Sequence, residues 1–316
     1  MAGKKRAVRK KRRLGLKIAA AVTACFLLFA AYMCVCGRVV HVRYASIYLR
    51  DLPAAFEGTT ILFVSDIDAR GEGDARAAAA LMDALAPLEP DLLLLGGDYA
   101  GPGLWDSLNG RDVQDAEIAA SAASARHVFL SSLADFPAPL GKFAVRAADD
   151  VLPTQLAQSM ATGGVRLLDG ETVRLTRDGQ SIVLAGLSPE TDIGQIADSV
   201  QTGECVIGLV HSPERFAVAL TDEAGDGGPW ADALLPGGTH GGQMRLGERT
   251  LLTLSEHERR YLSGWRKEGD VFLLTSQGVG CEYVGLRLNT RAEVHFITLR
   301  RASQPLEEEN NGIFMQ

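Results

Sequence analysis

Apolar segments that end in an aspartate, a histidine or a glycine turn recur along this sequence. The first, "TTILFVSDIDA" (59–69), ends in acids, and the second, "PDLLLLGGDYAG" (90–101), ends in glycine and an acid. Between them lies an alanine-rich segment with an apolar helical face, residues 74–88. A strand, a helix and a strand in this order predict a βαβ unit, whose strands are parallel and buried on both faces.

The same pattern continues through the rest of the chain. A helix is expected at 115–134, short strands within 165–188, and further strands at 141–150, 204–216, 231–246, 270–280 and 292–301. In open α/β sheets, binding sites form at the carboxyl ends of the strands. Five residues at such ends are therefore expected to meet in one polar pocket: Asp66, Asp98, Asp149, His211 and His240.

Carboxylates and imidazoles gathered in one pocket are typical ligands of a divalent metal. Taken singly, each has an ordinary explanation, because Asp66 or Asp98 could cap a helix or form a turn. A lone histidine after a strand is more often structural than a ligand. His41, His127, His257 and His295 receive that structural interpretation. The others are interpreted as ligands because they share a position after apolar strands.

Residues 18–36 form a run of nineteen residues without a charge. As a helix this run would be about 28 Å long, close to the roughly 30 Å thickness of the bilayer hydrocarbon core. A cleaved signal peptide is the alternative. The pair Cys34 and Cys36 makes a poor small-residue cleavage site, so the sequence favours an uncleaved transmembrane anchor.

Charge is distributed unevenly. Residues 1–17 carry nine cations and no acid, so the remainder of this chain of net charge −7 carries −16. The basic flank predicts a cytoplasmic N-terminus, a single-pass anchor in the cytoplasmic membrane and a C-terminal domain outside the cytoplasm. The acidic body argues against nucleic acid as a partner, because phosphate contacts need a positive surface. Two cysteines, Cys205 and Cys281, lie beyond the anchor; a disulfide between them is one option and two buried thiols the favoured one.

Five blocks in this order resemble the motifs of calcineurin-like metallophosphoesterases: "FVSDID", "PDLLLLGGDY", "PLGKFAVRAADD", "GLVHSP" and "GGTHGGQMRL". The later stretch "SGWRKEGDVFLLTSQGVG" resembles the membrane-anchored bacterial branch that includes YkuE- and YaeI-like phosphoesterases. The resemblance covers roughly residues 40–300 and implies a four-layer α/β/β/α sandwich of the α/β class. The expected organisation is a basic N-terminus (1–17), an anchor (18–36), a metallophosphoesterase-like domain (38–301) and a disordered acidic tail (302–316).

The resemblance implies one metal site made by Asp66, Asp68, Asp98 and His240. Asp68 stands where the family has a histidine, which makes the set richer in oxygen and favours Mn²⁺, with Mg²⁺, Ca²⁺, Fe and Zn²⁺ as other options. The second site of the family would use Asp98 and His211. Its asparagine and its second histidine are replaced here by Ala148 and Gly238, so one ion is expected.

Two acids are the candidate catalytic residues. Asp149 replaces the family histidine that assists the leaving group, and Asp150 is the acid that follows it in the motif. The incomplete site favours a membrane-anchored protein with weak or no phosphoester hydrolysis and a binding or scaffold role. The alternative is an active phosphoesterase or pyrophosphatase with an acid-rich site. The expected partners are the membrane and a phosphate-containing small molecule or lipid.

Overall fold

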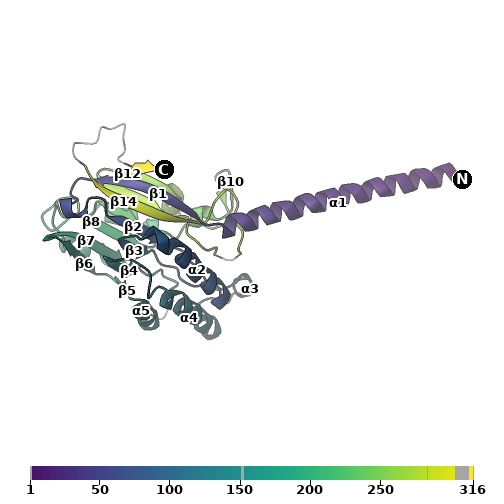
Figure 1. The fold of residues 1–316 in the computed structure, drawn as a ribbon. Helices are drawn as coiled ribbons and strands as arrows, with labels where there is room; N and C mark the ends of the chain where they lie inside the picture. Colours follow the sequence, from purple (N-terminus) through teal and green to yellow (C-terminus); the bar gives the residue numbers. More distant parts are fainter. Residues whose placement is uncertain (1, 151–152, 283, 303–312, 316) are drawn as a thin grey trace.

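Two β-sheets face each other, and helices cover their outer faces (Figure 1). The computed structural model describes residues 2–150, 153–282, 284–302 and 313–315. The larger sheet has the order β15 (Ile313–Met315), β1 (His41–Leu49), β14 (Glu293–Arg301), β2 (Thr60–Val64), β3 (Leu92–Leu95), β4 (Gly141–Ala144), β5 (Val165–Leu167). The smaller has the order β12 (Gly264–Glu268), β13 (Val271–Thr275), β9 (Ala233–Leu235), β8 (Val206–Val210), β7 (Gln180–Leu187), β6 (Thr172–Arg177).

Three apolar cores hold these layers together. The central core lies between the sheets and includes Phe63, Leu94 and Ile207. A second core packs the larger sheet against α2 (Glu72–Leu85), α4 (Ala116–Ser131) and α5 (Pro153–Thr162). A third packs the smaller sheet against α6 (Ile193–Asp198) and α7 (Phe216–Ala219). This is the predicted α/β/β/α sandwich.

The predicted βαβ unit is confirmed. β2 and β3 are parallel neighbours with Ile61 opposite Leu92, and the side chains of Leu92–Leu95 are fully buried. Burial of one such leucine contributes about 1.5–3 kcal/mol, which explains the continuous apolar run. The predicted helix at 115–134 is α4, whose first turn is capped by the Asp115 side chain accepting from Glu117 N.

Two regions differ from the expected elements. The strand expected over 231–246 is only the three residues of β9, because the chain then turns through η4 (His240–Gly242). A small hairpin follows, β10 (Arg245–Leu246) with β11 (Arg249–Thr250), and then α8 (Glu256–Arg260). Of the predicted tail, residues 303–312 and 316 lie outside the described residues, and β15 pairs antiparallel with β1.

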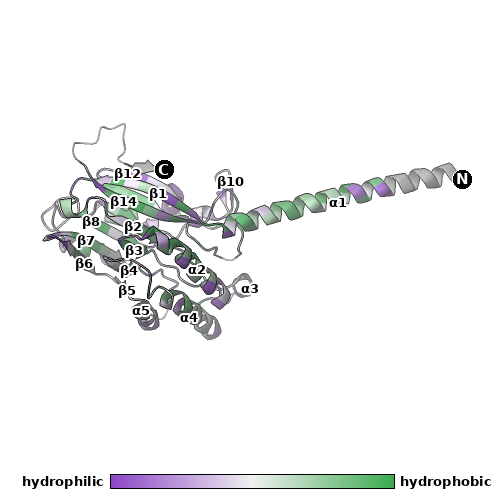
Figure 2. Cartoon of the chain, in the orientation of Figure 1, coloured by the Kyte–Doolittle hydropathy of each residue, from purple (hydrophilic) through white to green (hydrophobic). Residues whose placement is uncertain are grey.

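α1 (Ala2–Arg38) projects from the domain as one long helix (Figure 1). Its segment Arg13–Arg38 is long and apolar enough to cross a membrane, and only 6% of its most apolar window is buried. Figure 2 shows this stretch as mainly hydrophobic, with a few hydrophilic positions at its end away from the domain. The low burial distinguishes α1 from the core helix of a soluble protein, although a signal sequence has the same properties.

The domain end of α1 is hydrogen-bonded to the segment that precedes β14. Arg287 N donates to Met33 O at 3.1 Å, and Ala292 N donates to Cys36 O at 3.5 Å. β1 follows immediately and pairs in parallel with β14, His41 opposite Glu293. β14 is antiparallel to β2, so the carboxyl end of β2 and of its parallel neighbours β3 and β4 lies at the end of the sheet where α1 joins.

A half-buried acid at the opposite end of the smaller sheet allows a test of pH dependence. Asp232 precedes β9 and accepts a hydrogen bond from Val206 N at 2.8 Å. Burial, reinforced by the charge of Asp51, raises the pKa of Asp232 to about 7. The unfolded chain has a lower pKa, so this group stabilises the fold fully below about pH 4, and that contribution is lost as the pH rises through 7.

Asp232→Asn keeps the acceptor for Val206 N and removes the charge of this half-buried group. We expect the variant to be more stable than the wild type by about 2 kcal/mol at pH 8, and the difference to disappear near pH 4. Thermal unfolding across this pH range measures both. Equal stability at pH 8 would mean that Asp232 is not held in a charge-excluding environment.

Candidate metal centre

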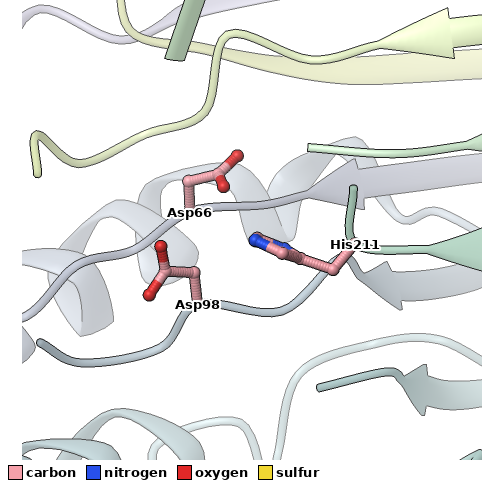
Figure 3. A group of neighbouring side chains, drawn as sticks. All are labelled: Asp66, Asp98 and His211. Atoms are coloured by element: carbon pink, nitrogen blue, oxygen red, sulfur yellow. The ribbon is translucent and has the colours of Figure 1, made fainter. Parts of the chain in front are cut away.

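Four of the predicted ligands come from strand ends that converge on one pocket. Asp66 follows β2, Asp98 follows β3, His211 follows β8 and His240 opens η4 after β9. The pocket has a volume of about 740 Å³, and Asp68, Asp98, His211 and His240 are among its lining residues. In Figure 3 the ring of His211 is directed toward the carboxylates of Asp66 and Asp98.

Two three-residue groups at and directly behind the wall of this pocket have the spacing of metal ligands. One is Asp66, Asp98 and His211, and the other is Asp68, Asp98 and His240; within each group the ligand atoms lie within 4.8 Å of one another. Asp98 belongs to both groups. The sequence assigned Asp66 to one site alone, whereas the structure also brings it to His211, so the second set contains three candidate ligands instead of two.

The candidate ligands share a strained backbone conformation. Four have φ in the left-handed region: Asp66 (54°), Asp68 (47°), Asp98 (60°) and His240 (48°). This region costs a non-glycine residue roughly 1–2 kcal/mol, and such strain concentrates at functional sites. The Asp98 loop is held against the Asp66 loop by backbone bonds, including Ile67 N to Asp98 O at 2.8 Å.

A backbone carbonyl orients the ring of His211. Its Nδ1 lies 2.9 Å from Gly96 O and can only donate to that oxygen, so in the neutral ring Nε2 has a lone pair. A histidine whose second nitrogen is fixed in this way is the usual arrangement at metal sites. Burial opposes protonation of His211, but the charges of Asp66 and Asp98 and this hydrogen bond raise its pKa.

Gly238, which occupies a ligand position of the family motif, has a specific packing role here. Its φ is +80°, and its N–H donates to Asp66 Oδ1 at 2.8 Å. A Cβ at this position would lie 3.1 Å from His211 O and 3.3 Å from His211 Nε2. A side chain at 238 would therefore crowd the nitrogen of His211 that is free to bind a ligand.

Several buried polar atoms in the pocket have no hydrogen-bond partner. They are Asp66 Oδ2, Asp68 Oδ2 and His240 Nδ1. His240 Nε2 lies 3.7 Å from Asp68 Oδ2, beyond hydrogen-bonding distance. Buried polar groups are nearly always paired, and a divalent cation would satisfy carboxylate oxygens in this arrangement. The residues present thus fit a metal ion.

The pKa values of the clustered acids and of His240 also fit a bound metal ion. Burial raises the pKa of Asp68 and of Asp98 well above the ordinary value, and neighbouring carboxylates raise both further. Burial also lowers the pKa of His240 to about 4, so its imidazole is neutral at physiological pH. Neutral imidazole and ionised carboxylate are the forms that bind metals, and a bound cation would favour ionisation of both acids.

The two candidate catalytic acids differ in environment. Asp149 is exposed and lines the pocket. Asp150 is fully buried, and its carboxylate accepts from Asp98 N at 2.8 Å, Ala147 N at 2.9 Å and Tyr99 N at 3.1 Å. Since its oxygens are occupied by backbone donors, Asp150 positions the Asp98 loop. This placement differs from the direct catalytic role that the sequence suggested.

Two further residues around the pocket carry no strand-end signal in the sequence. Glu282 follows β13 by several residues and lines the pocket, and its charge contributes to the raised pKa of Asp68. Arg287 is fully buried, and its guanidinium donates to the carbonyls of His240, Gln277, Gly278, Gly280 and Arg291. The charged guanidinium therefore ties the His240 turn to the loop after β13.

No family model matches the chain. It is 28% identical to phosphodiesterase YaeI of Escherichia coli over 285 residues, which cover 85% of this chain and 91% of that protein. It is 25% identical to the uncharacterized protein YpbG of Bacillus subtilis over 291 residues, 91% of this chain and 98% of that protein. The phosphopantetheinyl hydrolase PptH of Mycobacterium tuberculosis, a solved structure, matches 72% of this chain and 91% of its own with a TM-score of 0.35 and 12% identity.

Proposed function

We propose that this chain, a metallophosphoesterase-like protein similar to phosphodiesterase YaeI, is a membrane-anchored, metal-dependent phosphodiesterase. The observation that carries the proposal is the pair of three-residue ligand groups that share Asp98 in one pocket. The name of the relative supports a diester as the substrate class. By the charge asymmetry of the N-terminus, the domain lies outside the cytoplasm.

The first ion would be held by Asp66, Asp68, Asp98 and His240, and a second group is available in Asp66, Asp98 and His211. The oxygen-rich ligand set suits Mn²⁺ well. A divalent ion in such a site polarises a phosphoryl oxygen and lowers the pKa of a bound water.

The remaining chemistry belongs to residues of the chain. Asp149 exposes its carboxyl group in the pocket wall, where it would assist the leaving oxygen of a bound diester. Asp150 keeps the Asp98 loop in place through its three backbone bonds. Arg287 keeps the His240 turn in place, so the geometry of the site depends on two buried positioning residues.

The position of the pocket supports a substrate at the membrane surface. The carboxyl ends of β2, β3 and β4 lie where α1 joins the sheet, and α3 (Leu104–Leu108) and β10 lie at that same end (Figure 1). The pocket opens between these two segments, because Ser107, Gly110 and Leu251 are among its lining residues.

Large apolar side chains are exposed on the two segments beside this pocket. Trp105 is 76% exposed and Leu108 is 66% exposed on α3, while Leu246 and Leu251 are 70% and 53% exposed on and beside the hairpin. Exposed apolar groups beside a pocket mark an interaction surface. A lipid-linked phosphodiester would place its head group in the pocket and its chains along this rim.

The test compares a soluble chromogenic phosphodiester, the matching monoester and a phosphodiester lipid in mixed micelles. The full chain in detergent should hydrolyse diesters with Mn²⁺ and not with a chelator, and the micellar lipid better than the soluble diester. Trp105→Ala and Leu108→Ala should each reduce hydrolysis of the micellar lipid and leave hydrolysis of the soluble diester unchanged. Metal-independent turnover, or no turnover of any diester by the Mn²⁺-loaded protein, would contradict the proposal.

A binding or scaffold role without turnover is the second candidate. Ala148 and Gly238 favour it, because neither can supply the ligand that the family motif has at its position. A chain that binds Mn²⁺ and the diester lipid stoichiometrically but leaves the lipid intact would select this role.

A further inference from the structure

A second polar pocket lies where α1 meets the domain, and it shares no lining residue with the pocket of the metal ligands. It has a volume of about 300 Å³, and three arginines line it: Arg43, Arg245 and Arg291. Tyr32 and Cys36 contribute from α1, one helical turn apart and therefore on the same face. We infer that this pocket binds the phosphate head group of an anionic phospholipid.

The charges in the pocket are only partly neutralised. Arg43 forms an ion pair with Glu293 at 3.1 Å. Within the described residues, the side chains of Arg245 and Arg291 have no ion-pair partner, and none of the residues that line the pocket is acidic. Two unneutralised guanidinium groups beside the Ser263 hydroxyl match a phosphate, which arginine can bind through two parallel hydrogen bonds.

The position of the pocket along α1 favours a lipid, rather than a soluble molecule, as the source of the phosphate. The uncharged run of α1 ends at Cys36, so Tyr32 and Cys36 lie in its last turn. Tyrosine at this depth is typical of the membrane interface. Domain residues packed against this turn therefore lie at the edge of the hydrocarbon core, directly beside the head-group layer, which extends about 5–8 Å beyond that edge. The pocket therefore faces lipid head groups continuously, whereas a soluble phosphate has to enter it.

The pocket also adjoins the His240 turn (His240–Gly242), which carries one of the candidate metal ligands. Gln277 lines it, and a Cβ on Gly241, next to His240, would lie 2.7 Å from Gln277 Oε1. Arg245 lies just beyond the same turn, and the Gln243 side chain donates to Val284 O and Leu286 O. A bound head group would hold the segments 243–245 and 289–291 against the end of α1 and so fix the orientation of the domain on the membrane.

The test is lipid competition on the full chain in detergent, measured by native mass spectrometry with phosphatidylglycerol and phosphatidylcholine. The wild type should prefer phosphatidylglycerol, and Arg245→Gln/Arg291→Gln should reduce that preference about tenfold or more. Arg166→Gln/Arg174→Gln, which removes two exposed cations that pair with Glu171 and Glu204, should retain it. The nine N-terminal cations are present in every variant and contribute a common background.

Thermal unfolding confirms that each variant is folded, and the experiment needs neither bound metal nor turnover, so its outcome is independent of the proposed activity. An unchanged preference in Arg245→Gln/Arg291→Gln, or an equal loss in the control, would overturn the inference. Displacement of phosphatidylglycerol by millimolar inorganic phosphate would overturn the assignment to a lipid and identify a soluble phosphate as the ligand.

Discussion

Asp98→Asn is expected to prevent binding of the divalent cation and to lower the proposed phosphodiesterase activity of the full chain by at least about 100-fold. Asp98 is the one residue common to both ligand groups, and asparagine removes its negative charge while preserving its shape. Asparagine also tolerates the left-handed backbone at this position, φ 60°. Hydrolysis of the chromogenic diester with saturating Mn²⁺ measures the loss.

The same substitution should affect stability in the opposite direction when metal is absent. Burial raises the pKa of Asp98 well above its ordinary value, so its ionised form destabilises the metal-free fold as the pH rises through the raised pKa. With a chelator at pH 8, Asp98→Asn should unfold at a higher temperature than the wild type. With Mn²⁺ at 100 times its dissociation constant, the wild type should gain about 2.7 kcal/mol and the variant nothing.

Asp112→Asn serves as the matched control, because Asp112 lines the pocket but belongs to neither ligand group. It should retain activity and the Mn²⁺-induced increase in stability. If Asp98→Asn hydrolysed the diester as the wild type does, the shared carboxylate would have no role in the reaction.

Arg287→Met is expected to destabilise the fold by about 3 kcal/mol, which lowers the unfolding temperature by roughly 5–10 °C. Methionine fills part of the volume but leaves buried carbonyls without the donors that Arg287 supplies. The His240 turn loses a contact as well, so Mn²⁺ affinity should fall about 10- to 100-fold. Thermal unfolding with a chelator and Mn²⁺ titration measure the two effects separately.

Arg249→Met removes the same charge from an exposed position on β11 and should change neither property. An Arg287→Met protein as stable as the wild type would show that the buried guanidinium does not stabilise these loops.

The sequence identified the layers of the fold because their signals are local. Continuous apolar runs such as Leu92–Leu95 specify buried parallel strands, and the apolar face of α2 specifies its packing. The length of β9 could not be predicted in the same way, since the apolar run up to Leu235 continues into the glycines around the His240 turn. The hairpin at Arg245–Thr250 pairs only four residues, which are too few to show the alternation of apolar and polar residues that would predict a strand.

At the site, the position of each residue after a strand was sufficient to predict that Asp66, Asp98, His211 and His240 lie close together. It could not assign roles within the group, because these depend on contacts between distant segments. The three backbone donors on Asp150 come from residues 98, 99 and 147, so its positioning role is visible only in the folded chain. Arg287 and Glu282 lie in a loop without periodicity, where sequence spacing gives no information about what they face.

The most direct test of the metal centre is the Mn²⁺ content of the purified full chain in detergent after equilibrium dialysis, measured beside Asp98→Asn. The structure predicts at least one bound ion per wild-type chain and none in the variant, with a second ion if Asp66, Asp98 and His211 act as a separate site. A wild-type chain without bound Mn²⁺, or equal binding by both proteins, would contradict the assignment of this cluster as a metal centre.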